Sequence, residues 1–285
     1  MTSVLILIAA PGSNAIDDSF AALAGSKPHW LAQGEAAEFA PPKNLAALRK
    51  SLAHLPIDIN IVPMKNRRKR LLIADMDSTM IEQECIDELG VVAGVGDTIK
   101  AITARTMRGE VDFEGALKER VGLLAGLNAS VIDDIMRERI TLMPGGKTLV
   151  ATMKAHGAVT ALVSGGFRQF TSRVAALVGF DNNEANDLII EHGKLAGKVA
   201  DPILGRHAKV ETLLRLCSIH GLTAIDTIAV GDGANDIPML QAAGMGVALH
   251  AKPKTRDATR YQVNHGDLTA LLYLQGYSRD EFSSA

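Results

Sequence analysis

The most reactive side chains follow an apolar run, Leu71–Ala74, after which Asp75 and Asp77 stand two positions apart. Such a run is typical of a buried strand, and side chains at i and i+2 of an extended chain point the same way. Two carboxylates this close repel each other unless a cation lies between them or one keeps its proton. Mg²⁺ takes oxygen ligands and suits that place. One carboxylate could then attack phosphorus and the other act as general acid and base, although a solvated acidic turn would look the same.

A hydroxyl and two glycines end a second apolar run. Val159–Val163 is followed by Ser164, Gly165 and Gly166. Backbone N–H groups at a helix start form an anion cradle together with a hydroxyl, and glycine lets the ligand approach closely. The alternative is an ordinary glycine turn.

A third apolar run, Thr227–Val230, ends in an acidic turn with Asp232, Asn235 and Asp236. Two carboxylates here suit the far side of a metal site, while Asp232 or Asn235 as a helix N-cap is the alternative. Lys209 lies on a predicted helix between the second and third turns. Its ammonium could neutralise phosphoryl oxygens, although a lone lysine is more often a surface residue. Together these segments predict a metal-assisted phosphoryl-transfer site.

The three runs alternate with helical segments, as parallel strands do when helices cover both faces of a sheet. This rhythm predicts an α/β fold with a Rossmann-like, doubly wound parallel sheet and a ligand site at the carboxyl ends of the strands. No strand is predicted between Ala74 and Val159, so we expect a helical cap inserted at about residues 80–143. The predicted cap helices are Ile81–Leu89, Thr98–Met107, Phe113–Leu124 and Ser130–Ile140.

The first part of the chain has a different pattern and predicts an N-terminal α+β domain at 1–64, followed by a catalytic domain at 65–285. Its elements follow the ferredoxin-like order β-α-β-β-α-β. The predicted strands are Val4–Ala9, Trp30–Gln33, Ala36–Phe39 and Ile57–Val62, and the predicted helices are Ala15–Ala24 and Asn44–Ala53. The stretch Pro63–Arg70 predicts a solvated basic linker.

Composition argues against several classes of partner. The formal charge of -2 and an aromatic content of 4% predict no binding to nucleic acid or to a membrane surface. Cys85 and Cys217 have no zinc-ligand spacing and fit a reducing compartment. The run Val4–Ala10 is too short to span a bilayer, and no basic residue precedes Lys27 as a signal peptide would require. We therefore expect a cytoplasmic protein.

In their order along the chain, the reactive segments resemble the motifs of the haloacid dehalogenase superfamily of phosphatases. Its four motifs correspond to Asp75–Thr79, Ser164, Lys209 and Gly231–Asp236. The resemblance implies that Asp75 forms an aspartyl-phosphate that water hydrolyses. It implies that Asp77 protonates the leaving alcohol and later activates the water, with Ser164 and Lys209 completing the catalytic set. The implied Mg²⁺ ligands are Asp75, the backbone carbonyl of Asp77, Asp232 and Asp236, the last directly or through water.

A closer resemblance, over about Leu71 to Leu274, is to the bacterial phosphoserine phosphatases of this superfamily. Glu84 lies where that family has a glutamate facing the substrate ammonium, and Arg120 where an arginine binds the substrate carboxylate. Such a pair suits a substrate that carries both charges beside its phosphate, although a solvated helix face is the alternative. Met107 and Phe113 match residues that close over the substrate. The implied substrate-binding residues are Glu84, Met107, Phe113, Arg120, Ser164, Gly165 and Asn235.

The resemblance implies a Mg²⁺-dependent enzyme that hydrolyses O-phospho-L-serine to L-serine and phosphate, the last step of L-serine biosynthesis. A related small-molecule phosphatase or phosphotransferase that uses the cap differently is one alternative, and a non-catalytic amino-acid sensor is another. Some members of the family carry an extra N-terminal module of the ACT type. The N-terminal domain is therefore expected to be ACT-like, with regulation or homodimerisation as its role and plain structural support as the alternative.

Overall fold

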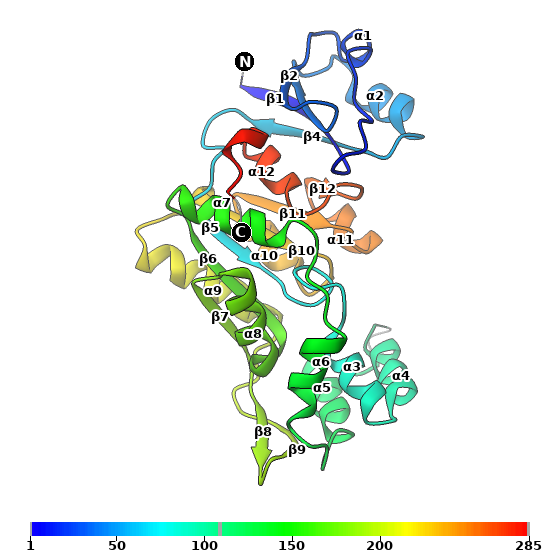
Figure 1. The fold of residues 1–285 in the computed structure, drawn as a ribbon, viewed down its shortest axis with the longest axis vertical. Helices are drawn as coiled ribbons and strands as arrows, with labels where there is room; N and C mark the ends of the chain where they lie inside the picture. Colours follow the sequence, from blue (N-terminus) through cyan, green and yellow to red (C-terminus); the bar gives the residue numbers. More distant parts are fainter. Residues whose placement is uncertain (1, 108–109, 284–285) are drawn as a thin grey trace. The chain divides into compact units, whose positions relative to one another are not determined.

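The computed structural model describes residues 2–107 and 110–283, and Figure 1 shows their helices and strands. A four-stranded sheet has the order β2-β3-β1-β4, and a six-stranded sheet has the order β12-β11-β10-β5-β6-β7. The first contains β1 (Ser3–Ala9), β2 (His29–Ala32), β3 (Ala36–Phe39) and β4 (Ile57–Pro63). The second contains β5 (Leu71–Ala74), β6 (Val159–Phe167), β7 (Asn182–Asn186), β10 (Thr227–Gly231), β11 (Met245–Leu249) and β12 (Tyr261–Val263).

Two compact units divide the chain. Unit 1 takes the residues up to Ile73, Met143–Thr160 and those from Leu213 on, and unit 2 takes Ala74–Leu142 and Ala161–Thr212. The helices of unit 1 are α1 (Phe20–Ala24), α2 (Leu45–Leu52), α7 (Gly146–Ala155), α10 (Ile237–Ala242), α11 (Pro253–Asp257) and α12 (Ala270–Leu274), with 3₁₀ turns at Ala224–Asp226 and Arg279–Glu281. Those of unit 2 are α3 (Cys85–Val92), α4 (Gly96–Met107), α5 (Phe113–Gly122), α6 (Val131–Glu138) and α8 (Arg168–Val178), and α9 (Arg206–Ile219) begins there.

The predicted α/β fold is confirmed. β5 has the predicted bounds and all four of its residues are buried, as expected for an apolar strand covered on both faces. The pairs β6–β7, β10–β11 and β11–β12 are parallel. No helix in the described part of the chain is long and apolar enough to cross a membrane.

The N-terminal segment forms the predicted α+β arrangement. Its elements follow the order β1-α1-β2-β3-α2-β4, and the sheet order β2-β3-β1-β4 is that of a ferredoxin-like fold. Alternate residues of β1 build a core with α1 and α2, because successive side chains of a strand point to opposite faces. The Asn44 side chain accepts a hydrogen bond from the Ala47 N–H at 3.0 Å, which caps α2 just after the Pro41-Pro42 pair.

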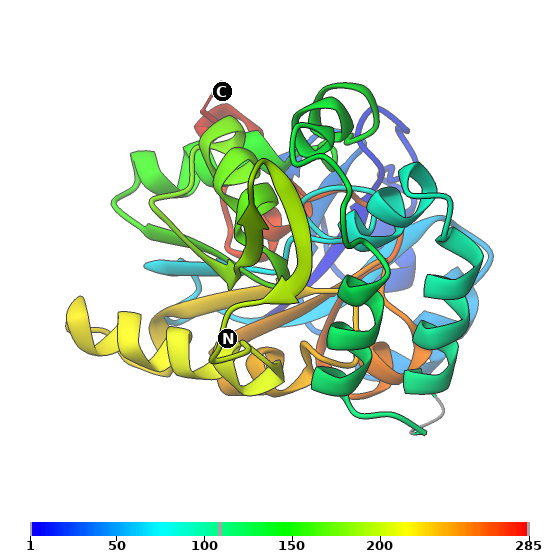
Figure 2. The same ribbon diagram turned by 90° about the horizontal axis from the view of Figure 1, so that it is seen from below.

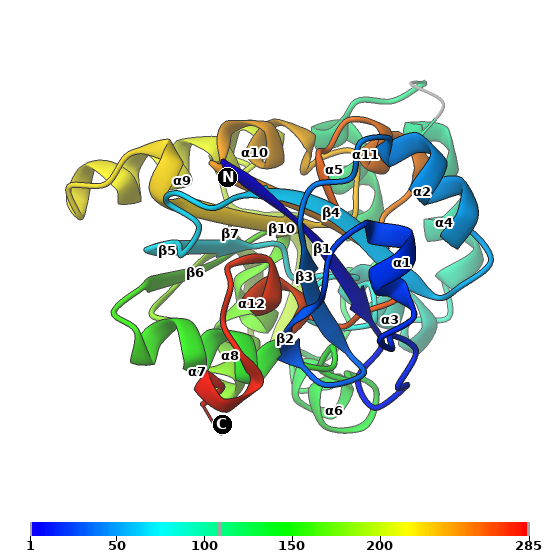
Figure 3. The ribbon, with the colours of Figure 1, turned by 90° about the horizontal axis from the view of Figure 1, so that it is seen from above.

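The other face of this sheet is covered by the C-terminal part of unit 1. Ile6 and Ile8 of β1 point away from α1 and α2, yet both are buried. Helix α12, whose five residues are all buried, lies against β1, as Figure 3 shows in red beside the dark blue strand. The Tyr273 hydroxyl of α12 donates to a Glu35 carboxylate oxygen at 2.8 Å. The N-terminal sheet therefore shares an apolar core with α12.

Two polar side chains of β4 form hydrogen bonds with the edge strand β12 and with the residues that follow it. The Asp58 carboxylate accepts hydrogen bonds from the backbone N–H groups of Asn264, His265 and Gly266 at 2.7 to 3.1 Å. Asn60 both donates to the Gln262 carbonyl at 2.9 Å and accepts from the Gln262 N–H at 3.0 Å. These contacts cover backbone groups that an edge strand would otherwise leave unpaired.

We expect Asp58→Ala to lower the free energy of unfolding by about 3 kcal/mol, because it removes a buried carboxylate from three backbone donors. Asp18→Ala, which removes an exposed carboxylate of the same segment, is the matched control. Urea unfolding followed by the fluorescence of Trp30, the single tryptophan, and by circular dichroism measures the change. A loss no larger than that of Asp18→Ala would show that the contact contributes little.

The predicted solvated linker is wrong for two of its residues. Arg67 is buried, forms an ion pair with Glu38, and donates to the carbonyls of Tyr273 and Leu274. Lys69 is also buried, and its ammonium donates to two backbone carbonyls at 2.7 Å. The charge pattern predicted solvation because sequence alone does not show which carbonyls lack partners.

Unit 2 contains a hairpin that the sequence pattern did not predict. It consists of β8 (Leu188–Glu191) and β9 (Lys194–Val199), which pair antiparallel. The segment between α5 and α6 bonds to β9, because the Gly126 N–H donates to the Leu195 carbonyl and the Leu195 N–H to the Leu127 carbonyl, both at 2.8 Å. Figure 2, from below, shows the yellow-green hairpin together with the green cap helices. Strand β9 of the hairpin therefore pairs with the segment that connects α5 to α6.

Candidate active site

Asp75 forms a buried ion pair with Lys209. Asp75 is the first residue after β5, and Lys209 lies in the first turns of α9. The Lys209 Nζ atom lies 2.6 Å from the Asp75 Oδ1 atom, and both side chains are less than 10% exposed. Burying an ion pair costs desolvation free energy. Buried charges of this kind are common at functional sites, where they serve a further purpose such as holding an anion.

Asp77 is held by contacts to both of its carboxylate oxygens. Oδ1 accepts a hydrogen bond from the Cys85 N–H at 2.8 Å, and Oδ2 accepts one from the Ser164 hydroxyl at 3.1 Å. The Gly166 N–H in turn donates to the Ser164 Oγ atom at 2.8 Å. The end of β6 therefore fixes the side chain that the sequence predicts as general acid.

Close contacts surround the two glycines near the end of β6. A Cβ atom at Gly166 would lie 2.8 Å from Asp77 Oδ2 and 3.0 Å from Ser164 Oγ. At Gly165 it would lie 3.2 Å from the ring of Phe113, which is partly buried. A larger residue at either position would displace a predicted site residue. An ordinary glycine turn, the alternative interpretation of this segment, does not account for these contacts.

Three buried aspartates could hold a cation. Asp75 of unit 2 and Asp232 and Asp236 of unit 1 are buried, and each offers a carboxylate oxygen as a metal ligand. Asp236 precedes α10 and accepts a hydrogen bond from the Gly233 N–H at 3.0 Å, while Lys252 Nζ lies 3.4 Å from Asp232 Oδ2. Carboxylate oxygens are the ligands that a hard divalent cation prefers.

Glu84 and Arg120 both lie in unit 2, and their opposite charges attract each other. The Ser78 hydroxyl donates to Glu84 Oε1 at 2.9 Å, and Ser78 has a left-handed backbone with φ of 55°. Burial lowers the pKa of Arg120, while the carboxylates of Asp87 and Glu84 raise it. A half-buried guanidinium of this kind favours an anionic ligand.

The contacts that orient Arg120 were not predicted from the sequence. Its Nη1 atom donates to Thr103 Oγ1 at 3.3 Å, and its Nε atom to the Ala116 carbonyl at 3.2 Å. Burial raises the pKa of Asp87, and the carboxylate of this residue has the largest electrostatic interaction with the Arg120 guanidinium. Asp87, Thr103 and Arg120 come from three different helices, so no sequence spacing signals their convergence.

Other predicted residues have fewer contacts or lie outside the described part. Asn235 is exposed, and its Nδ2 atom lies 3.5 Å from Asp236 Oδ1. Met107 ends α4, but its side chain lies outside the described residues. Cys85 and Cys217 are free and buried, and burial together with the Asp77 charge raises the pKa of Cys85 well above its usual value. Its thiol is therefore protonated and not a nucleophile.

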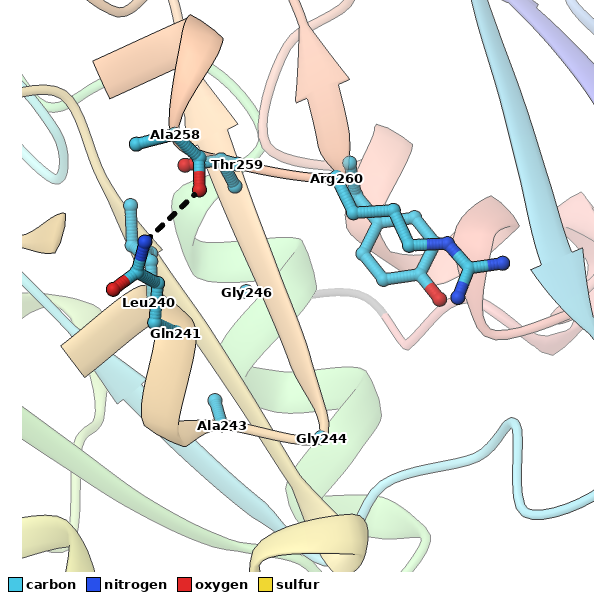
Figure 4. Close-up of a pocket in the computed structure, with 9 residues that line it drawn as sticks. Leu240, Gln241, Ala243, Gly244, Gly246, Ala258, Thr259 and Arg260 are labelled. Carbon is cyan, nitrogen blue, oxygen red and sulfur yellow. Dashed lines mark hydrogen bonds between the residues drawn. The ribbon is translucent and has the colours of Figure 1, made fainter. Parts of the chain in front are cut away.

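A surface pocket of unit 1 contains none of these residues. It has a volume of about 230 Å³ and is lined by the end of α10, the start of β11 and the residues before β12. Figure 4 shows Gln241 donating to the Ala258 carbonyl at one wall and Arg260 at the other. The pocket brings together no group of reactive side chains.

Comparison with known proteins identifies the family. The family model of haloacid dehalogenase-like hydrolases matches residues 72–241. A Streptomyces coelicolor protein named phosphoserine phosphatase is 43% identical over 241 residues, which are 84% of this chain and 58% of that protein. A Lactococcus lactis protein of the same name is 44% identical over 204 residues, which are 72% of this chain and 94% of that protein.

Solved structures agree with the sequence relatives. A haloacid dehalogenase family hydrolase from Salmonella enterica serovar Typhi has a TM-score of 0.84 at 29% identity, with 98% of this chain and 100% of that chain covered. Against the first four sequence relatives, the chain spans 56% to 65% of their length. Because the family model covers more than half of the sequence, the chain belongs to the haloacid dehalogenase-like hydrolase family.

Proposed function

We propose that this chain is a Mg²⁺-dependent phosphatase that hydrolyses O-phospho-L-serine to L-serine and phosphate, the last step of L-serine biosynthesis. The observation that carries the proposal is the buried Asp75–Lys209 pair, with Asp77 and Ser164 bonded to each other beside it in the same unit. The relatives named phosphoserine phosphatase support the choice of substrate, and the chain covers 94% of the Lactococcus lactis relative.

We assign each catalytic residue the role that the family resemblance implies and that its contacts support. An oxygen of Asp75 attacks phosphorus, the bond from phosphorus to the serine oxygen breaks, and Asp77 gives its proton to the leaving serine oxygen. Asp77 then takes a proton from the water that attacks the aspartyl-phosphate, which releases phosphate and restores the Asp75 carboxylate. Lys209 and the Ser164 hydroxyl offset the negative charge of the phosphoryl oxygens.

The donor set suits a hard divalent cation, and Mg²⁺ is the ion we propose. Asp75, Asp232 and Asp236 would hold it through carboxylate oxygens, and Asp77 through its backbone carbonyl. When bound, such an ion neutralises carboxylate and phosphoryl charge and orients the phosphate.

The cap residues would select the amino-acid part of the substrate. Glu84 would pair with the ammonium and Arg120 with the carboxylate of phosphoserine. Phe113, which lies near both Gly165 and Gly205, and Met107 would cover the bound molecule. The backbone at Gly165 and the amide of Asn235 would contact the phosphate.

We expect Arg120→Ala to raise the KM for phosphoserine roughly 10- to 100-fold, since it removes a charge-assisted contact to the carboxylate. The KM for p-nitrophenyl phosphate should change little, because this substrate has no carboxylate. Arg105→Ala is the matched control, since Arg105 is a largely exposed arginine of α4 paired with Glu119. Equal losses on both substrates would show that Arg120 is structural.

A screen of phosphate esters with and without Mg²⁺ tests the identity of the substrate. Hydrolysis of many esters at similar rates would contradict the choice of phosphoserine and support only a phosphatase of this family.

The remaining assignments are also proposals. We keep the domain bounds at 1–64 and 65–285, with the cap at about 80–143, and an ACT-like regulatory or dimerisation role for the first domain. Because one face of its sheet packs on α12 and β4 holds β12, a homodimer would use the outer strand β2. We propose a cytoplasmic location, which two unpaired cysteines support, and no nucleic-acid or membrane partner.

A further inference from the structure

A buried asparagine outside the four motifs joins two loops of the candidate site. Asn186 is the last residue of β7 and is 1% exposed. A buried side-chain amide is costly unless its donors and acceptor are satisfied. The partners of Asn186 therefore indicate what its burial achieves.

The Asn186 side chain bonds to backbone groups of two segments of the candidate site. Its Nδ2 atom donates to the Gly165 carbonyl at 2.9 Å and to the Leu204 carbonyl at 3.3 Å. Its Oδ1 atom accepts from the Leu204 N–H at 2.7 Å. One amide thus links the irregular end of β6 to the segment before α9.

The strand register explains why the first loop needs this partner. β6 pairs with β7 in parallel up to Val163, and the register then shifts before Phe167 pairs with Asn186. The residues between, Ser164 to Gly166, leave the regular ladder and form the predicted anion cradle. A bulged segment has backbone groups without strand partners, and the Asn186 side chain supplies one for Gly165.

The second loop leads directly to the catalytic lysine. Leu204 stands just before Gly205, and α9 begins at the next residue and carries Lys209. Lys209 reaches Asp75 at 2.6 Å only if α9 starts in the right place. The same amide therefore governs the position of the Ser164 turn and that of the lysine.

We infer that Asn186 is a positioning residue that sets the spacing between the Ser164 turn and Lys209, and so shapes the site for the phosphate group. This inference rests on the proposed function. Because it concerns the phosphoryl end of the substrate, it predicts equal effects on all phosphate esters. It also predicts weaker binding of inorganic phosphate.

Two variants and one control test this role in the full chain with Mg²⁺. Asn186→Ala removes all three hydrogen bonds, and Asn186→Asp keeps the size and the acceptor for Leu204 but loses the donors. Asn183→Ala is the control, because Asn183 lies on the same strand and accepts hydrogen bonds from Thr171 and Ser172 of α8 instead. The measurements are kcat and KM for phosphoserine and p-nitrophenyl phosphate, the inhibition constant of inorganic phosphate, and the melting temperature.

We expect both Asn186 variants to lower kcat/KM by about 10- to 100-fold on both esters, with the ratio between the esters unchanged, since each loses at least the two hydrogen bonds that Nδ2 donates to backbone carbonyls. The inhibition constant of phosphate should rise, and Asn183→Ala should change neither quantity. A lower melting temperature with unchanged phosphate inhibition in either variant would overturn the inference. Phosphoserine left intact by the unaltered protein would instead overturn the proposed function, and phosphate inhibition of aryl phosphate hydrolysis would still test Asn186.

Discussion

Asp75→Asn is expected to lower kcat on phosphoserine by about 10⁴-fold or more, because a carboxamide oxygen is a poor nucleophile toward phosphorus. The substitution keeps the size of the side chain but removes the charge that pairs with Lys209 at 2.6 Å. It also removes one of the three carboxylates proposed as Mg²⁺ ligands. Steady-state release of phosphate with saturating Mg²⁺ measures the effect.

The control for this variant is Asp257→Asn, which makes the same chemical change on an exposed residue at the end of α11. It should leave kcat unchanged. Residual turnover of the Asp75 variant within tenfold of the unaltered protein would contradict covalent catalysis by Asp75.

Asp77→Asn is expected to lower kcat on phosphoserine by about 10²- to 10⁴-fold, the usual contribution of a general acid and base. The serine oxygen is a poor leaving group without a proton, whereas p-nitrophenolate leaves without one. With p-nitrophenyl phosphate the variant should therefore show a rapid burst of one product per site, followed by slow turnover. Stopped-flow absorbance of nitrophenolate measures the burst.

The burst separates two roles of Asp77. If Asp77 mainly orients Ser164, to which its Oδ2 atom is bonded at 3.1 Å, both phases should slow together. Ser164→Ala, which removes that contact but keeps the carboxylate, should reduce the burst rate without making the second phase selectively slow. A missing burst in Asp77→Asn would contradict its role as general base for water.

The sequence predicted the elements that depend on apolar runs. β3 and β5 have the predicted bounds, and β1, β4, β6 and β10 differ from prediction by one to four residues at their ends. Asp75 directly follows β5 and Lys209 lies on a helix, as the sequence predicted, whereas their chemical roles come from the family resemblance and stay predictions. The helix predicted at Ala15–Ala24 was too long, since only Phe20–Ala24 is helical.

The sequence did not predict elements that polar residues build. β7 has the sequence Asn-Asn-Glu-Ala-Asn, which has no apolar run, and it forms because parallel pairing to β6 satisfies its backbone. Asn186 was overlooked for the same reason. Arg67 and Lys69 were expected in solvent, but carbonyls from distant parts of the chain bind them. Contacts between residues far apart in sequence leave no local pattern.

The most direct test of covalent phosphoryl transfer identifies the residue that carries the phosphate. The protein with Mg²⁺ is mixed with phosphoserine, quenched in acid during turnover, reduced with borohydride and digested for mass spectrometry. An aspartyl-phosphate is converted to homoserine by this treatment. We predict homoserine at position 75, and its absence from the Asp75→Asn variant. Phosphoserine turnover without any modified residue, or with the modification at another aspartate, would contradict the assignment of Asp75 as nucleophile.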